Sequence, residues 1–361
     1  MTSRQAAIRK VTSSLQTNLY IGVSNRTGGD VSGLYRRAAE SDRWTLCDLP
    51  SGTHVHAVTV DPSDPAVVYA AASSGLYRSR DRGKTWRPLI EPDGREQFWS
   101  VLIHPSNPGT ILAGTAPLGL YRSDDGGETW ERMPRPAIAE RMVGAFPSRI
   151  MRMAIAPAKP DTIWAGMEVN GAMRSDDGGE SWIDLSDELV NLSKQPELQS
   201  AILTKDPAEG MLDVHAICVS PSAPDSPFLA LRMGLFRGEN RGETWKDLNI
   251  GQHATHLRYG RDVVVAPWDS ATLFACVADS SRGVAGRLYK SEDTGAHWAQ
   301  IDRGIEVRST MMAVAVDRND PDRLHCVARR DQSFSTTDGG QSWREVALPE
   351  GAGTAVAVAC G

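Results

Sequence analysis

The chain has 361 residues and a formal net charge of −6 at pH 7, from 39 basic and 45 acidic side chains. This acidic balance argues against a protein whose main partner is nucleic acid or an anionic membrane surface. No apolar segment of signal-peptide length occurs near the N-terminus, and no later stretch approaches the ~20 apolar residues of a membrane span. The sequence therefore predicts a soluble, cytoplasmic protein. Its five cysteines are scattered, unlike a disulfide framework or a metal motif, and are expected to be small buried hydrophobic residues.

One turn pattern returns along the chain: Ser or Thr, Asp two residues later, Gly two residues after that, then Thr or Ser followed by Trp. Copies occupy residues 79–86, 123–130, 175–182, 291–298 (with His297 before the Trp) and 336–343. Residues 238–245 lack the leading hydroxyl and the Asp, and a seventh copy keeps little beyond Trp44. In such a hairpin turn Asp accepts backbone hydrogen bonds, Gly supplies positive φ, and Trp begins the next strand. These residues are therefore expected to be structural.

Each unit contains four predicted strands. A Gly-Leu-Tyr-Arg-Ser strand precedes the turn, and before it come a Val/Ala-rich strand and another apolar strand that ends in a turn such as residues 61–65. The seven Trp positions recur at intervals that suit the ~40–50-residue period of propeller blades. The sequence thus predicts an all-β, seven-bladed β-propeller of four-stranded antiparallel blades in a single domain, residues 1–361. The predicted blades are residues 18–50 plus 353–360, 54–90, 97–134, 149–186, 213–249, 259–302 and 310–348.

The first unit lacks an innermost strand of its own, because its first predicted strand has the character of a second strand. The C-terminal segment 353–360 alternates small and apolar residues and has the character of the missing strand. We therefore expect the two ends of the chain to share one blade, which removes exposed sheet edges.

The repeated turns resemble those of the BNR/Asp-box propeller superfamily, which includes sialidases, xyloglucanases, the sortilin ectodomain and photosystem assembly factors. The resemblance covers nearly the whole chain. It implies that the Asp boxes lie on the face away from the ligand site, and it does not imply one activity. A sialidase is disfavoured, since no Arg-Ile-Pro motif and no clear arginine triad occur. The chain is also about half the length that a two-propeller xyloglucanase needs.

A site is expected at the mouth of the central channel, where the innermost strands start. Aligning the units on the residue before the strand-ending turn places six side chains in one layer: His56, Trp99, Met151, His215, Arg261 and Met312. The layer two residues earlier holds His54, Gln97, Arg149, Asp213, Tyr259 and Thr310, whereas the layer two residues later is apolar. Where only packing matters, repeats carry similar residues, so chemically different residues at equivalent places suggest a small-molecule site.

Loops on the same face add further candidates: Asn25, Arg26, Glu168, Asn170, Arg232, Asp279, Arg329 and Asp331. Two long connections also gather there, residues 132–148 and 183–210, the second with a helix-like stretch at 187–194. Long ordered loops in compact domains are often lids, and these two could instead mediate contacts in a homo-oligomer.

Several chemistries fit these residues. The favoured one is a hydrolase that cleaves an ester- or lactone-like C–O bond of a small substrate. In it His54, His56 or His215 is the acid or base, Asp213 or Glu168 orients it, and Arg149, Arg261 and Tyr259 stabilise an oxyanion. Substrate contacts are predicted for Gln97, Trp99, Met151, Glu168, Asn170, Arg232 and Met312. No cofactor is needed, although His54, His56, Asp213 and His215 could hold one divalent metal ion.

Two alternatives stay open. One is a glycosidase or lyase that acts on a carbohydrate, with two carboxyl groups drawn from Asp213, Glu168 and Asp279. The other is a non-catalytic propeller scaffold that binds a protein or peptide.

Overall fold

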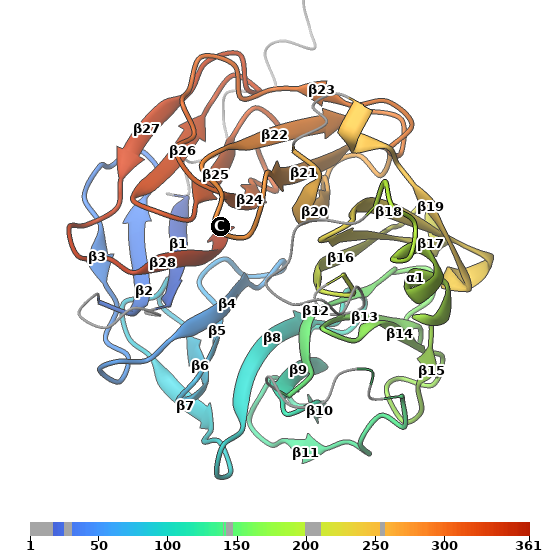
Figure 1. Cartoon of the computed structure of the whole chain (residues 1–361). Coiled ribbons are helices and arrows are strands. Elements are labelled where there is room, and N and C mark those ends of the chain that lie inside the picture. Colours follow the sequence, from blue (N-terminus) through green and yellow to red (C-terminus); the bar gives the residue numbers. More distant parts are fainter. Residues whose placement is uncertain (1–16, 25–30, 140, 142–146, 199–210, 253–256) are drawn as a thin grey trace, which may run out of the picture.

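The computed structural model describes residues 17–24, 31–139, 141, 147–198, 211–252 and 257–361. Their strands form seven four-stranded antiparallel sheets around a central axis (Figure 1). The predicted seven-bladed β-propeller is therefore confirmed. Among these residues no helix has the length and apolar character needed to cross a membrane.

The blades follow one another along the chain, and each runs outward from its innermost strand. Blade 1 consists of β28 (Thr354–Cys360), β1 (Asn18–Ser24), β2 (Gly33–Ala38) and β3 (Thr45–Leu46). Blade 2 consists of β4 (Val55–Val60), β5 (Val68–Ala72), β6 (Gly75–Ser79) and β7 (Arg87–Ile90). Blade 3 consists of β8 (Gln97–Ile103), β9 (Ile111–Ala116), β10 (Gly119–Ser123) and β11 (Glu131–Arg132).

The remaining four blades have the same plan. Blade 4 consists of β12 (Arg149–Ile155), β13 (Ile163–Glu168), β14 (Gly171–Ser175) and β15 (Ile183–Asp184). Blade 5 consists of β16 (Val214–Ser220), β17 (Ala223–Leu231), β18 (Gly234–Glu239) and β19 (Thr244–Asp247). Blade 6 consists of β20 (Tyr259–Val265), β21 (Leu273–Ala278), β22 (Gly286–Ser291) and β23 (Ala299–Gln300). Blade 7 consists of β24 (Met311–Val316), β25 (Leu324–Ala328), β26 (Gln332–Thr336) and β27 (Arg344–Ala347).

Three short helices of the described residues lie outside the sheets. The helix-like stretch expected at 187–194 forms α1 (Asp187–Leu192), between blades 4 and 5. Two 3-10 helices, η2 (Asn240–Gly242) and η3 (Ile250–Gln252), lie in the turn of blade 5 and in the connection that follows it.

The ring closes through the two ends of the chain, as predicted. β28 pairs antiparallel with β1, with Cys360 opposite Leu19 and Thr354 opposite Ser24. The backbone N–H of Asn18 also donates to the carbonyl oxygen of Gly361 over 2.7 Å. β28 contacts β4 on one side and β24 on the other, so it occupies the innermost place of blade 1.

The hydrophobic core lies between neighbouring blades rather than inside one of them. Between blades 4 and 5, for example, Trp164 and Leu185 pack against Val214, Phe236 and Trp245. Comparable buried clusters occupy the other six interfaces. The five cysteines are free thiols, buried or half-buried, as expected.

The Asp-box turns are held by the hydrogen bonds that their sequence predicts. In blade 2 the Ser79 hydroxyl donates to Asp81 over 2.8 Å and accepts from the backbone N–H of Gly83, also over 2.8 Å. Asp81 accepts the backbone N–H of Thr85 over 2.9 Å, and the Trp86 indole donates to the Gly83 carbonyl. Gly83 has a φ of 74°, a conformation that favours glycine. The prediction of a structural role is thus confirmed.

These turns lie on one face of the ring. In blade 2 the backbone N–H of Arg82, inside the Asp box, donates to the carbonyl of Ala66, in the turn between the first two strands. Since every blade has four antiparallel strands, each innermost strand begins on the opposite face. We call that opposite face the entry face.

A repeated arginine fastens each of three successive interfaces on the Asp-box face. It belongs to the Gly-Leu-Tyr-Arg-Ser strand, or its equivalent, and donates to a backbone carbonyl in the Asp box of the next blade. The pairs are Arg78 with Gly126, Arg122 with Gly178, and Arg174 with Arg241.

Candidate functional site

Every innermost strand carries a β-bulge at the same place near the entry face. In blade 2, Val55 pairs with Ala72 and Ala57 pairs with Ala71, so His56 has no partner opposite it in β5. Equivalent shifts leave six more residues without a pairing partner in the adjacent strand, namely Trp99, Met151, His215, Arg261, Met312 and Val356. A bulge re-aims its side chain and removes it from the ladder. The first six of these seven are the layer predicted from sequence, and Val356 completes the ring.

The side chains of three blades form a continuous stack on the entry face. The imidazole of His56 stacks on the indole of Trp99, with ring centroids 3.7 Å apart and planes 8° apart. The guanidinium carbon of Arg149 lies 3.9 Å from the centroid of the same indole. Trp99 thus links His56 of blade 2 with Arg149 of blade 4. Its role in substrate binding stays a prediction.

Arg149 also forms an ion pair with Glu168 at the end of β13. Both side chains are largely buried, with 14% and 17% of their surface exposed. The indole below the guanidinium and the carboxylate beside it thus fix the position of Arg149, and the ion pair leaves Glu168 negatively charged.

Asp213 lies beside this ion pair, one residue before β16. Its Oδ1 accepts the backbone N–H of Val169 over 3.0 Å, which places it next to the end of β13. Burial, together with the negative charge of Glu168, raises the pKa of Asp213 to about 7. The two predicted carboxyl groups therefore lie together, and Asp213 holds its proton to a much higher pH than an ordinary carboxyl group does.

His215 is held by both of its ring nitrogens. Its Nδ1 lies 2.7 Å from the carbonyl oxygen of Gly260, and its Nε2 lies 2.9 Å from the hydroxyl of Tyr259. A carbonyl only accepts, so Nδ1 carries the proton and Nε2 accepts from Tyr259. Burial holds the pKa of His215 well below its usual value, and the positive charge of Arg261 acts in the same direction. His215 is thus a neutral residue that joins blades 5 and 6.

Tyr259 has two arginines beside it. The guanidinium carbon of Arg232 lies 5.9 Å from the centroid of the Tyr259 ring, and Arg261 is adjacent to its hydroxyl. Burial raises the pKa of Tyr259, so the phenol stays protonated. The residues predicted from blades 4, 5 and 6 therefore meet in one place.

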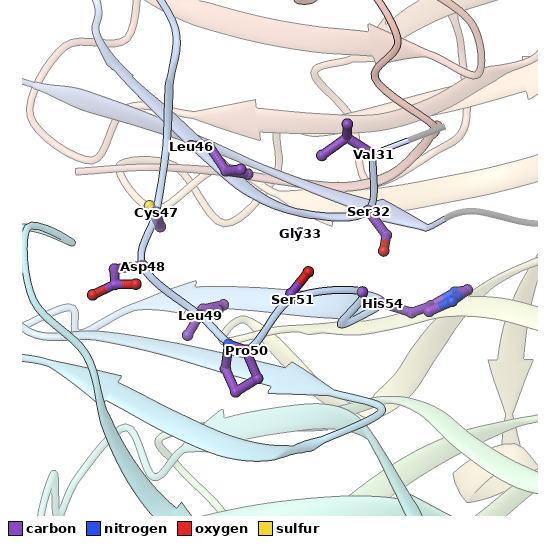
Figure 2. Close-up of a pocket in the computed structure, with 11 residues that line it drawn as sticks. Val31, Ser32, Gly33, Leu46, Cys47, Asp48, Leu49, Pro50, Ser51 and His54 are labelled. Atoms are coloured by element: carbon purple, nitrogen blue, oxygen red, sulfur yellow. The ribbon is translucent and has the colours of Figure 1, made fainter. Parts of the chain in front are cut away.

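His54 lies at the edge of this cluster. Its Nδ1 forms a hydrogen bond of 2.8 Å with the hydroxyl of Ser24, and its ring centroid lies 6.4 Å from that of His56. His54 also borders a pocket of ≈ 560 Å³ formed by β2, β3 and the connection to β4. Figure 2 shows its imidazole extending away from the other side chains that line this pocket. Apart from His54, the residues that line this pocket are not members of the cluster.

Other predicted substrate residues lie apart from the cluster. Met312 is 5% exposed and packs into the apolar cluster between blades 7 and 1. Asn170 is 2% exposed, and its amide accepts from the backbone of Arg141 and donates to the carbonyl of Ala139, so it holds a connecting segment. Gln97 and Met151 are half-buried in β8 and β12. Met312 and Asn170 thus make structural contacts, and their substrate contacts stay a prediction.

Most of the loop candidates also have structural partners. Asp279 accepts the backbone N–H groups of Ser280 and Val284, and Arg329 donates to the carbonyl of Ser281. Asp331 lies in a turn with a φ of 53°. Asn25 and Arg26 lie outside the described residues, as does the segment 199–210. A role of the long connections as lids or oligomer contacts stays a prediction.

The four residues suggested as metal ligands do not form one site. Within the described part of the chain, no group of three or more His, Cys, Asp or Glu side chains is arranged to hold a metal ion. The lone pair of His215 Nε2 already accepts from Tyr259, and His54 binds Ser24. The donor set suggested from sequence therefore does not fit a metal.

Two charged residues that were not predicted from sequence, the half-buried Arg152 and the buried Asp262, lie one position after the bulges of blades 4 and 6. Asp262 accepts the backbone N–H of Val314 over 3.0 Å, which joins blades 6 and 7. Burial raises the pKa of Asp262, while the positive charge of Arg152 opposes that shift. The same position holds Ala or Ser in the other five blades. A charged residue at a position where the other blades carry a small residue is the sequence signal that could have identified Arg152 and Asp262.

Comparison with known proteins supports the fold. A family model described as "Sortilin, neurotensin receptor 3" (Sortilin-Vps10) matches residues 74–215. An oligoxyloglucan-reducing end-specific xyloglucanase from Emericella nidulans is 23% identical over 90% of this chain and 39% of its own length. The chain therefore spans less than half of the relative that it matches.

Two solved structures have similar folds. The GH74 xyloglucanase from Xanthomonas campestris superposes with a TM-score of 0.61 at 20% identity, over 94% of this chain and 55% of that one. YCF48 bound to D1 peptide superposes with a TM-score of 0.53 at 14% identity, over 91% of this chain and 97% of that one. At these identities the likeness shows the fold alone.

Proposed function

We propose that this chain, a seven-bladed propeller of the Asp-box superfamily, is a glycoside hydrolase in which Asp213 is the general acid and Glu168 its ionised counterpart. One observation carries the proposal: two carboxyl groups lie next to each other, Glu168 paired with Arg149, and Asp213 with a pKa raised to about 7 by burial and by the charge of Glu168. Glycosidases need such a pair, one group to protonate the leaving oxygen and one to act as base or nucleophile.

The roles follow from the contacts. The pKa of Asp213 is about 7, because the residue is buried and Glu168 is close, so near neutral pH a large share of the molecules has a proton on Asp213 to give to the glycosidic oxygen. Glu168 is positioned by Arg149, which is itself fixed against Trp99. The negative charge of Glu168 can stabilise the positive charge that develops on the sugar ring or direct a water molecule toward it.

The hydrogen bonds of His215 favour this chemistry over cleavage of an ester or lactone with His215 as the base. A histidine base needs a free lone pair, and that of His215 accepts from Tyr259. The xyloglucanase names of the relatives also favour a carbohydrate substrate. The ester or lactone reaction, with Arg149, Arg261 and Tyr259 as oxyanion donors, stays a weaker alternative.

The test is hydrolysis of a panel of oligosaccharides and aryl glycosides by wild type, Asp213→Asn, Glu168→Gln and, as a control, Glu350→Gln. Glu350 is exposed in the connection to β28, on the entry face. We expect D213N and E168Q to lose about 10²- to 10⁴-fold in kcat/KM and E350Q to keep it. The kcat/KM of wild type should fall above about pH 7, as Asp213 loses its proton. Full activity of D213N, or no cleavage of any glycoside, would refute the proposal.

A second candidate is a peptide-binding scaffold, and one observation favours it. The chain covers 97% of YCF48 bound to D1 peptide but only 55% of the Xanthomonas xyloglucanase, so its length suits a single propeller. A scaffold should bind a peptide from a defined library equally well in wild type and D213N, and neither protein should cleave a glycoside.

A further inference from the structure

The entry-face cluster contains more cationic than anionic side chains. Three arginines lie close enough to His215 for their charges to depress its pKa: Arg261, Arg232 and Arg149. A fourth, Arg152, lies near Arg261 and Asp262. Against these four stand Glu168, which pairs with Arg149, and Asp262, whose charge acts on Arg152 and Arg261. The pKa of Asp213 is raised to about 7, so near neutral pH this carboxyl group carries only part of a negative charge.

Arg232 and Arg261 are the two arginines of the cluster that lie beside Tyr259. In the described part of the chain, neither forms an ion pair with a carboxylate within 4.0 Å. The Nε of Arg261 is buried and has no hydrogen-bond acceptor among the described residues. Arg232 lies over the ring of Tyr259, and Arg261 is beside the hydroxyl of the same residue. The two guanidinium groups thus flank one side chain from neighbouring blades.

A buried guanidinium N–H without an acceptor is unfavourable, and two cations at one site repel each other. Both costs disappear when a carboxylate or sulfate binds between them, because guanidinium groups match the planar or branched oxygens of such anions. Water alone supplies acceptors but no negative charge.

We infer that the entry face binds the anionic group of an acidic saccharide, a carboxylate or a sulfate ester, between Arg232 and Arg261 beside the Tyr259 hydroxyl. This inference rests on the proposed function, since it names the class of sugar that reaches Asp213 and Glu168. Tyr259 is the first residue of β20, and Asp213 immediately precedes β16 of the adjacent blade. The anionic group and the bond to be cleaved therefore belong to neighbouring parts of one ligand.

The test is calorimetric binding to the whole chain, which needs no catalysis. The probes are methyl β-glucuronide, glucose 6-sulfate, methyl β-glucoside and inorganic sulfate. We expect the wild type to bind one or both acidic sugars about 10- to 100-fold more tightly than the neutral glycoside. That affinity should weaken as the salt concentration rises. The two acidic sugars then separate a carboxylate from a sulfate ester as the recognised group.

Variants test whether Arg232 and Arg261 form the anion-binding site. Arg232→Met and Arg261→Met should each lose about 10-fold or more of the affinity for the acidic sugar and little of that for the neutral one. Arg282→Met is the matched control, because Arg282 is an exposed arginine of the β21–β22 connection on the same face. If a variant fails to fold, the affinity of the wild type for acidic compared with neutral sugars still tests the inference.

Three results would overturn the inference: equal affinity for acidic and neutral sugars, unchanged affinity in both folded variants, or binding of inorganic sulfate as tight as that of either sugar. These results are separable from failure of the proposed function. Cleavage of neutral glycosides without any preference for charge refutes the anion site alone. Binding of the acidic sugar without cleavage of any glycoside refutes the catalytic roles alone.

Discussion

Asp213 and His215 are two residues apart, and burial moves the pKa of each toward its uncharged form. The pKa of Asp213 rises to about 7, whereas that of His215 falls well below its usual value. At neutral pH His215 is uncharged and Asp213 is about half protonated, although three arginines, Arg149, Arg232 and Arg261, lie close to His215. The electrostatic character of the site is therefore set by its arginines and by Glu168.

The raised pKa of Asp213 predicts a stability that depends on pH. In the unfolded chain its pKa is about 3.9, so between pH 4 and pH 7 the folded protein binds more protons than the unfolded chain. The free energy of unfolding therefore falls as pH rises through this window. The asparagine side chain of D213N binds no proton, so this variant should gain about 2–4 kcal/mol over wild type between pH 4 and pH 8.

This difference is measured by urea unfolding of both proteins at several pH values. All other titratable groups are the same in the two proteins, so their contributions to the pH dependence cancel. The amide introduced by Asp213→Asn keeps an oxygen for the N–H of Val169, which makes D213N a conservative change. A difference that stays constant across this range would show that Asp213 is ionised in the folded protein.

At the scale of single elements, the Asp-box turn is a local unit whose stability can be measured alone. In blade 4, Asp177 accepts from the hydroxyl of Ser175 over 2.7 Å and from the backbone N–H of Ser181 over 2.9 Å. The hydroxyl and backbone N–H of Ser181 hold the pKa of Asp177 at about 2. The carboxylate thus ties both ends of the turn together.

Asp177→Ala should lower the free energy of unfolding by about 1–2 kcal/mol, because it removes these acceptors from the turn. Glu180→Ala is the control, since Glu180 is an exposed acidic residue of the same turn. The deficit of D177A should shrink as the pH falls from about 4 to about 2, because Asp177 of the unfolded wild-type chain binds a proton before Asp177 of the folded protein does. Equal stability of the two variants at pH 7 would contradict a structural role for the box.

The site was predicted from sequence in its position but not in its contacts. Aligning the repeats placed His56, Trp99 and His215 in one layer, because equivalent residues of equivalent strands lie at equal depth. The bulges escaped prediction, since a bulge depends on how two strands pair and leaves no mark on one strand alone. Likewise, the stack of Arg149 on Trp99 joins two blades, and no pattern within one repeat encodes it.

At the scale of the whole molecule, the ring depends on its closing strand. β28 fills the innermost place of blade 1 and contacts the innermost strands of both neighbouring blades. Without it, β1 has an unpaired edge, and the apolar cluster that includes Ala355 and Tyr35 opens to water. The strand was predictable because blade 1 lacked a first strand and residues 353–360 matched the pattern of one.

Removal of residues 353–361 should therefore abolish cooperative unfolding and the near-ultraviolet circular dichroism signal of packed aromatic residues. A synthetic peptide of residues 353–361 should restore both by pairing with β1, whereas a peptide of the same composition in scrambled order should not. A truncated chain that still unfolds cooperatively at the wild-type urea concentration would show that the other blades hold the ring without closure.

The number of blades was also predictable, because seven tryptophan-marked turns each imply one blade. Function was less predictable, since the Asp boxes recur on the face opposite the candidate site. What distinguishes this chain lies in the few residues that break the repeat, such as Asp213, Arg232 and Asp262.

The seven bulges have a consequence for protein engineering. A bulge residue has no pairing partner in the neighbouring strand, so its replacement changes no strand register and leaves the inter-strand pairing intact. Seven such positions, one in each blade, form a circle on a frame whose strand register does not depend on them. His215 and Met312 of this circle also hold neighbouring blades together, so libraries randomised at Met151 and Arg261 should yield new ligand specificities while the ring keeps its fold.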